Sequence, residues 1–399
     1  MVQTSFQAAL GWQVWDLTHD ARYIAYLGAA RFVPQLIAAL YAGAFADAHD
    51  RKRIVLLAQC VPAACAGVLL AATLTGALTL PLIYGLVILI ALAAAFDNPA
   101  RQSLLPSIVP ESLFQNAITV SSTIQSLAGI IGAALQGVLI ASFGIESVYG
   151  AIVVLIFLAT FAVAALRPRA VSQPPRAVSW AAIREGVSFV RRRQPLLGSM
   201  TLDMFAVVFG GAQAMLPIYA TDILQVGPVG FGILSAALPA GAMLMSVVMV
   251  LLPPIERSGR TLLLSVAAFG VATMVFGAAR WFPLSVLAYM AVGMADQLSV
   301  VMRQTTIQLS TPDHLRGRVT AVAQLFIGAS NQLGAVESGF VAAATSATFA
   351  VVSGGAACIA VGGAVATSMP ELRRYTIHDV LASGRRDRER GDTPEAAGG

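Results

Sequence analysis

Residues 43–53 read G-A-F-A-D-A-H-D-R-K-R, and this stretch joins two apolar runs that are each more than twenty residues long. Its last seven positions hold two carboxylates and three cations. Lipid-spanning segments rarely carry so many charges, so we expect the stretch to lie in water where two membrane helices meet. Two roles stay open for it: a solvated turn that only sets topology, or a part of the protein's mechanism.

The composition restricts the chain to one broad class. Of the 399 residues 57% are hydrophobic and 11% are charged, and the mean hydropathy is +0.76. Soluble domains carry about 25% charged residues, and a membrane β-barrel would show roughly ten-residue alternating segments. The sequence therefore predicts an all-α integral membrane protein with the lipid bilayer as partner, and it excludes a soluble enzyme or binding module. The net charge of +5 does not indicate nucleic acid, because the cations lie between the apolar runs.

Hydropathy predicts twelve crossings in two groups of six, since about 20 apolar residues span the hydrocarbon. They lie at 2–17, 22–46, 54–75, 79–99, 117–141 and 146–166, and at 198–220, 229–252, 261–280, 283–303, 319–342 and 346–368. We expect an N-terminal bundle at 1–166, a linker at 167–197, a C-terminal bundle at 198–368 and a disordered tail at 369–399. The first crossing carries Gln3, Gln7 and Gln13, which suggests that it faces a cavity.

The basic residues predict the orientation. All of the 25 except Arg22, Arg31 and Arg280 fall on or beside one side of the membrane, which the positive-inside rule makes cytoplasmic. We therefore expect a multi-pass protein of the cytoplasmic (inner) membrane with both termini inside. No cleavable signal peptide is visible. Within the linker, apolar residues from Trp180 to Val190 recur at helical spacing and predict an amphipathic helix on the inner membrane surface.

The two groups of six repeat one another. At a shift of 202 residues, R-Q-S-L-L-P-S-I-V-P-E-S-L from Arg101 aligns with R-Q-T-T-I-Q-L-S-T-P-D-H-L from Arg303. The same register pairs Gly137 with Gly339 in the next helix. The repeat predicts two six-helix bundles related by pseudo-two-fold symmetry, with the substrate site at their interface.

These segments resemble the major facilitator superfamily, whose loop after the second helix reads roughly G-x-L-A-D-R-x-G-R-R. Asp47, Arg51 and Lys52 match that pattern, whereas Ala48 and Asp50 depart from it. The segments A-L-G-W-Q-V-W-D-L-T, F-D-N-P-A-R-Q-S-L-L-P and T-P-D-H-L-R-G-R-V resemble its enterobactin-exporter branch. The resemblance covers essentially the whole chain.

The resemblance implies a conformational latch that joins the two halves on the inner face. Asp47 would pair with Arg101 and lie near the start of the eleventh crossing, around Val319, where a helix N-terminus stabilises a carboxylate. The latch would favour the outward-open state, and breaking it would permit alternating access. Asp97 and Arg101 stand at i and i+4, a spacing that puts both on one helix face. Together with Asp47 and Arg51, they are the expected residues of the latch.

The fifth crossing reads G-I-I-G-A-A-L-Q-G over residues 129–137. In exporters of the superfamily this helix carries a glycine-proline pair, and Ala133 stands here in place of the proline. The spaced glycines suit close helix packing as well as an exporter signature, and both interpretations stay open.

Five ionisable residues fall at membrane depth, where each costs roughly 2.5–3.5 kcal/mol on insertion scales: Asp16, Arg31, Asp203, Asp296 and Glu337. Asp16 and Arg31 could pair with each other or contact substrate or an ion. Asp203 lies near enough to the cytoplasmic end to snorkel or cap a helix. Asp296 and Glu337 have uncharged counterparts at the repeat-equivalent positions. A carboxylate in a low-dielectric cavity can exchange protons near neutral pH, so we hypothesise that Glu337 or Asp296 couples proton entry to substrate exit.

Enzymatic, metal and phosphate-binding motifs are not found, so we expect no catalytic residues, no cofactor and no metal. The cysteines Cys60, Cys65 and Cys358 lack the spacing of a zinc site and are expected to be buried. An ion gradient is then the expected energy source. The sequence predicts a monomeric secondary transporter for proton-coupled efflux of a small amphiphilic molecule, siderophore-like or drug-like. An importer or facilitator, or a membrane sensor or scaffold that does not transport, remains the alternative.

Overall fold

A computed structural model describes residues 2–48, 50–108, 113–165, 180–253 and 255–376. The first half of the chain forms six helices: α1 (Val2–Thr18), α2 (Ala21–Ala48), α3 (Arg51–Leu74), α4 (Leu80–Ile108), α5 (Phe114–Phe143) and α6 (Ile145–Ala165). The second half forms α8 (Gln194–Phe209), α9 (Ala212–Ile218), the π-helix η2 (Tyr219–Ile223), α10 (Gly227–Leu251), α11 (Ser258–Ala278), α12 (Phe282–Ser310), α13 (Asp313–Ala344) and α14 (Ala347–Ser368). Two short helices flank that second group, α7 (Trp180–Arg192) before it and α15 (Pro370–Arg374) after it.

Every predicted crossing except the seventh falls on one helix. Among the described residues, nine helical stretches are long and apolar enough to cross a membrane. The other three predicted crossings are α1, α2 and α13. They carry glutamines and charges at membrane depth, because they line the interior of the molecule as described below.

The seventh crossing is not the single continuous helix that hydropathy predicts. It divides into α8, α9 and η2, with a break at Gly210 and Gly211. A Cβ atom at Gly211 would collide with the Ser338 hydroxyl and the Gly334 carbonyl of α13. The break thus lets the crossing approach α13 at backbone distance, which a continuous hydropathy profile does not reveal.

The internal repeat is reproduced in the helix bounds. α4 begins at Leu80 and α12 at Phe282, and they end at Ile108 and Ser310, so both ends differ by 202 residues. This is the shift that the sequence repeat predicts, and it confirms two groups of helices built to one plan.

Successive helices run antiparallel, so the charged connections gather at one end of the molecule. We call the end that carries Lys52, Arg53, Arg101 and Arg191–Arg193 the basic end. The other end, which carries Thr75, Gly144 and Ala279, is the opposite end. The Lys52 ammonium donates to the Ala164 carbonyl at 2.7 Å, which ties the start of α3 to the end of α6 at the basic end.

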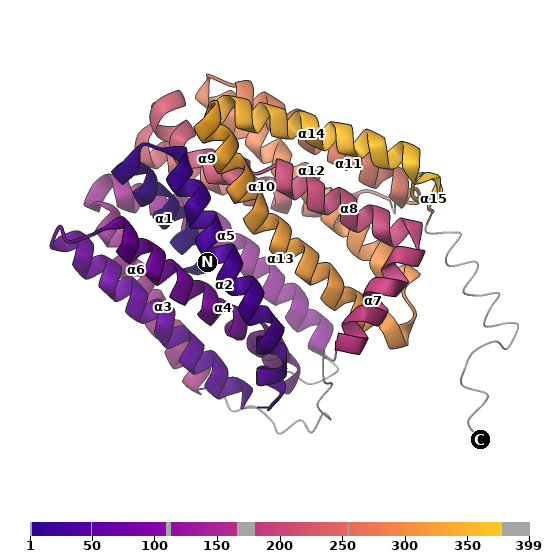
Figure 1. Cartoon of the computed structure of the whole chain (residues 1–399), viewed down its shortest axis with the longest axis horizontal. Coiled ribbons are helices and arrows are strands. Elements are labelled where there is room, and N and C mark those ends of the chain that lie inside the picture. The colour runs from indigo at the N-terminus through magenta and orange to yellow at the C-terminus, as the bar shows by residue number, and fades with distance from the viewer. Residues whose placement is uncertain (1, 49, 109–112, 166–179, 254, 377–399) are drawn as a thin grey trace, which may run out of the picture.

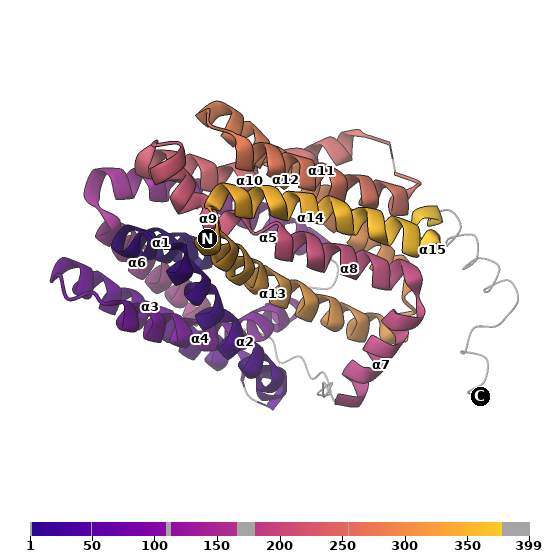
Figure 2. The same ribbon diagram turned by 45° about the horizontal axis from the view of Figure 1, so that its top comes forward.

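The two groups of helices meet along few elements. α2 packs against α13 and α5 against α10, with a smaller contact between α1 and α9. Figures 1 and 2 both show the ribbons of the two groups lying together at one end and diverging towards the end that carries α7.

Close contacts between the groups lie in the half of the molecule nearest the opposite end. A Cβ at Gly137 of α5 would lie 2.6 Å from the Pro228 carbonyl oxygen and 2.7 Å from the Gly232 Cα of α10. On the other flank, a Cβ at Gly339 of α13 would lie 2.7 Å from the Ala25 backbone of α2. The molecule is therefore closed at the opposite end by backbone-to-backbone packing.

Aromatic residues of α1 complete this closure. The Trp12 ring packs against Phe231 of α10 with centroids 4.9 Å apart. The Trp15 indole donates to the Thr221 hydroxyl of η2 at 2.9 Å.

The beginning of the predicted disordered tail is ordered, which corrects the expected boundary at 369. Leu372 of α15 is fully buried, and its carbonyl occupies the place where Gly259 of α11 has no side chain. The Tyr375 hydroxyl hydrogen-bonds the Ser310 hydroxyl at 2.7 Å, and burial raises the pKa of this phenol. α15 therefore joins the basic ends of α11 and α12, whereas residues 377–399 of the predicted tail lie outside the described residues.

Candidate functional site

A cavity of about 370 Å³ lies between the two groups of helices. Its wall combines α1, α2 and α5 of the first group with α8–α13 of the second. Gln7 of α1 is one of the lining residues, which confirms that the first crossing faces a cavity, whereas Gln13 is buried and bonded to Tyr149 and Thr73. The cavity lies at the interface of the two repeats, as the repeat predicts.

Two opposite charges face this cavity. Arg31 comes from α2 and Asp296 from α12. Within the described part of the chain, neither side chain makes a hydrogen bond or an ion pair. A lone charge in a low-dielectric environment is costly. We therefore expect both side chains to interact with a solute, an ion or water in the cavity.

Neutral polar residues also line the cavity, and sequence reasoning did not identify them. Gln136 of α5, Ser235 of α10 and Tyr289 of α12 each hold buried polar atoms that have no hydrogen-bond partner among the described residues. Gln136 belongs to the fifth-crossing segment quoted above, where only the glycines and Ala133 drew attention. Its position one residue before a helix-contact glycine was the available signal.

Glu337 is placed away from this wall. It is partly buried on α13 and accepts a hydrogen bond from the Ser338 hydroxyl at 3.1 Å, and it is not among the residues that line the cavity. Of the two carboxylates that the sequence proposes for coupling, the structure thus places only Asp296 on the cavity.

Asp203 is held in a buried ion pair. Its carboxylate contacts the guanidinium of Arg303, so the pair joins α8 to α12. Both side chains are almost inaccessible, at 7% and 4% exposed. Neither snorkelling nor helix capping describes this carboxylate, because its partner comes from another helix in the interior of the second group.

Asp16 and Arg31 do not pair, although the sequence allowed it. Asp16 is exposed near the end of α1, and Arg31 faces the central cavity. Among described residues no ion pair joins them. The two side chains lie at different depths, because Asp16 is close to the opposite end whereas Arg31 lies ten residues inside α2.

The charged group at the basic end is described in part. The Arg101 guanidinium binds the Asp97 carboxylate at 2.6 Å, which confirms that the two share one face of α4. Asp50 caps α3 by accepting hydrogen bonds from the backbone N–H groups of Lys52 and Arg53 at 2.9 and 3.4 Å. The departure from the family pattern at Asp50 therefore has a structural use. The side chains of Asp47 and Arg51 lie outside the described residues.

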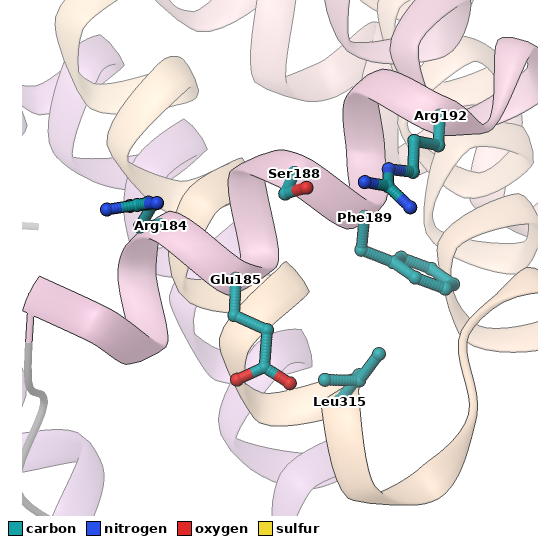
Figure 3. A pocket seen from close by; sticks show the side chains of 6 residues that line it. All are labelled: Arg184, Glu185, Ser188, Phe189, Arg192 and Leu315. Atoms are coloured by element: carbon teal, nitrogen blue, oxygen red, sulfur yellow. The ribbon is translucent and has the colours of Figure 1, made fainter.

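A second hollow, of about 440 Å³, lies on the surface at the basic end between α7 and α13. Figure 3 shows Glu185 and Phe189 of α7 pointing towards Leu315, while Arg184 points away from them. Beside it, Val190 of α7 and Leu315 of α13 share one apolar cluster. The amphipathic linker helix is thereby fastened to the start of α13.

The glycines of the fifth crossing serve two different surfaces. Gly137 has α10 backbone against it, whereas an added Cβ at Gly129 would meet nothing within 4 Å and that residue lines the cavity. Helix packing explains the first glycine and not the second.

The helices, the repeat and the polar cavity between the halves define a polytopic membrane transporter. The family model described as "Transmembrane secretion effector" matches residues 4–389. The chain belongs to this family of major facilitator superfamily transporters.

Relatives and solved structures agree with this placement. The multidrug efflux pump Tap of Mycobacterium tuberculosis is 29% identical over 92% of this chain and 90% of its own length. The enterobactin exporter EntS of Escherichia coli is 24% identical over 90% of this chain and 85% of its own. In fold, the chain is similar to a peptide transporter POT, with a TM-score of 0.72 and 12% identity over 94% and 93% of the two chains. It is also similar to the nucleoside transporter NupG, with a TM-score of 0.69 and 13% identity over 92% and 96%.

Proposed function

We propose that this transporter exports small amphiphilic molecules, drug-like or siderophore-like, and that proton entry drives the export. The observation that carries the proposal is the cavity between the halves, which combines apolar walls with one cation, one carboxylate and several neutral polar groups. Such a lining suits solutes that have an apolar body and a few polar groups. The names of the relatives, an efflux pump and an exporter, support the direction.

We assign the coupling role first to Asp296. It lines the cavity, and it has no described partner that would hold it ionised. Proton binding at Asp296 and substrate binding beside it can therefore exclude one another, which is what exchange requires. Glu337 is the second candidate, and its contact with Ser338 makes it less available.

The experiment compares matched amide variants in proteoliposomes with an imposed pH gradient, and ethidium is the probe. Asp296→Asn should abolish the acceleration of ethidium transport by the gradient and leave slow downhill movement. Glu337→Gln should retain most of the acceleration. Gradient-driven transport that is unchanged in both variants would refute proton coupling through these carboxylates.

We further propose that the basic end faces the cytoplasm of the inner membrane and that both termini lie there. The concentration of arginine at that end supports this orientation. We also propose that the protein works as a monomer whose two helix groups, residues 1–166 and 198–368, move as rigid bundles. An importer on the same scaffold would accumulate the probe in vesicles of the opposite orientation, so the direction of gradient-driven movement decides between these functions.

The latch remains part of the proposal. In this structure the opposite end is closed and Arg101 binds Asp97 on its own helix, with one Asp97 oxygen left without a partner among the described residues. We propose that Asp47 and Arg51 join this pair when the basic end closes. Closure there and opening at the opposite end would then occur together, as alternating access requires.

A further inference from the structure

Three polar residues of the cavity wall hold buried polar atoms that have unused hydrogen-bonding capacity. Both amide atoms of Gln136 and the hydroxyls of Ser235 and Tyr289 have no partner among the described residues. Gln136 is 3% exposed and Tyr289 is 1% exposed. Leaving a buried polar group unpaired is destabilising, and here three such residues line one cavity.

The packing of the helices holds these groups on one wall. α5 and α10 meet at Gly137 and Gly232, so Gln136 and Ser235 come from the same stretch of that interface. α12 in turn packs along α10 and contributes Tyr289, whose ring packs against Phe276 at a tilt of 34° with centroids 4.8 Å apart. Backbone contact thus positions Gln136 and Ser235, and ring packing positions Tyr289, before any solute enters.

The wall differs in chemistry from the charged part of the cavity. Arg31 and Asp296 are the two ionisable residues of the cavity wall and respond to the charge of a solute. A carboxamide and two hydroxyls carry no net charge, and each can donate and accept. They therefore suit an N–H, O–H or carbonyl group on a solute and add nothing to the binding of a purely apolar surface.

We propose that Gln136, Ser235 and Tyr289 form a polar subsite that hydrogen-bonds an N–H, O–H or carbonyl group on an amphiphilic substrate. This inference rests on the proposed function and adds the substrate class: an apolar body that carries amide, amine, phenol or hydroxyl groups. A site built to hydrogen-bond such groups discriminates strongly against analogues that lack them, because its own polar atoms then stay unpaired.

Two rhodamine dyes test the subsite. Tetramethylrhodamine methyl ester and its parent with free amino groups share the same ring body, ester and positive charge, and only the parent carries N–H donors. Binding of each dye to the purified full-length transporter is measured by fluorescence anisotropy. The wild-type protein should bind the amino dye about tenfold more tightly than the methylated dye.

The variant Gln136→Leu should erase this preference. It should weaken amino-dye binding about tenfold and leave methylated-dye binding unchanged or stronger, which also shows that the variant is folded. Ser235→Ala and Tyr289→Phe should each reduce the preference. Ser5→Ala is the matched control, because it removes a hydroxyl from another wall of the same cavity, and it should keep the preference.

A wild-type protein that does not distinguish the dyes would overturn the proposal, and so would a preference that survives all three substitutions. The variant Asp296→Asn separates this test from that of the proposed function. It should lose gradient-driven export while keeping the preference for the amino dye. Loss of the subsite is thus detected by dye binding, and loss of proton coupling is detected by gradient-driven transport.

Discussion

Substitution of Gly137 by alanine should shift the transporter towards the state that is open at the opposite end. The added methyl would lie 2.6 Å from the Pro228 carbonyl oxygen and 2.7 Å from the Gly232 Cα, and both are backbone atoms that cannot rotate away. Overpacking of this kind costs about 1–3 kcal/mol. Only the state in which α5 and α10 touch is penalised, so the ratio of the two states should change by about 5- to 150-fold.

Spin labels can report this change. In a variant without its native cysteines, labels at Leu74 of α3 and Trp281 before α12 lie on different helix groups near the opposite end, and both residues are about two-thirds exposed, at 67%. Pulsed electron–electron double resonance should show that a longer distance between the two labels gains population in Gly137→Ala. Gly129→Ala is the control on the same helix, because its added Cβ would meet nothing within 4 Å. Identical distance distributions for the two variants would refute the reasoning, as would a loss of stability without any redistribution.

Three further predictions concern the ends and the interior. Asp47→Asn should reduce transport at least tenfold with normal expression. Normal transport in vesicles would mean that residues 43–53 only set the membrane topology. Gly259→Ala should release α15, because the added methyl collides with the Leu372 carbonyl, and limited proteolysis should then cut the tail faster than in the unaltered protein. Asp203→Asn leaves the buried Arg303 unpaired at a cost of about 3–5 kcal/mol, so a strongly lowered thermal midpoint is expected; an unchanged midpoint would contradict the ion pair.

The fold was largely predictable because crossing a membrane imposes long apolar runs, and because the repeat links the two halves. The helix break at Gly210 and Gly211 was not, since the hydropathy of the seventh crossing continues through it. Its cause is the close approach of α13 at Gly334, more than one hundred residues further along the chain.

The charged residues of the candidate site could be predicted from the sequence, whereas its uncharged polar residues could not. Arg31 and Asp296 stand out because a charge at membrane depth needs a reason, and both line the cavity. Gln136, Ser235 and Tyr289 carry no charge, and only the rotation of each helix in the structure shows that they line the cavity. The choice of partner for Asp203 likewise depends on which helices are neighbours, so the sequence alone allowed solvent where the structure has Arg303.

The Asp203–Arg303 pair also has a consequence for how the protein is made. Arg303 follows Asp203 by one hundred residues in the chain. At a synthesis rate of about 5–20 residues per second, the carboxylate is made roughly 5–20 seconds before its partner. During that interval α8 has no guanidinium to neutralise it, so stable insertion of this helix depends on the later arrival of α12. The second half of the transporter should therefore mature as one unit, and a chain truncated before Arg303 should be a substrate for membrane quality control.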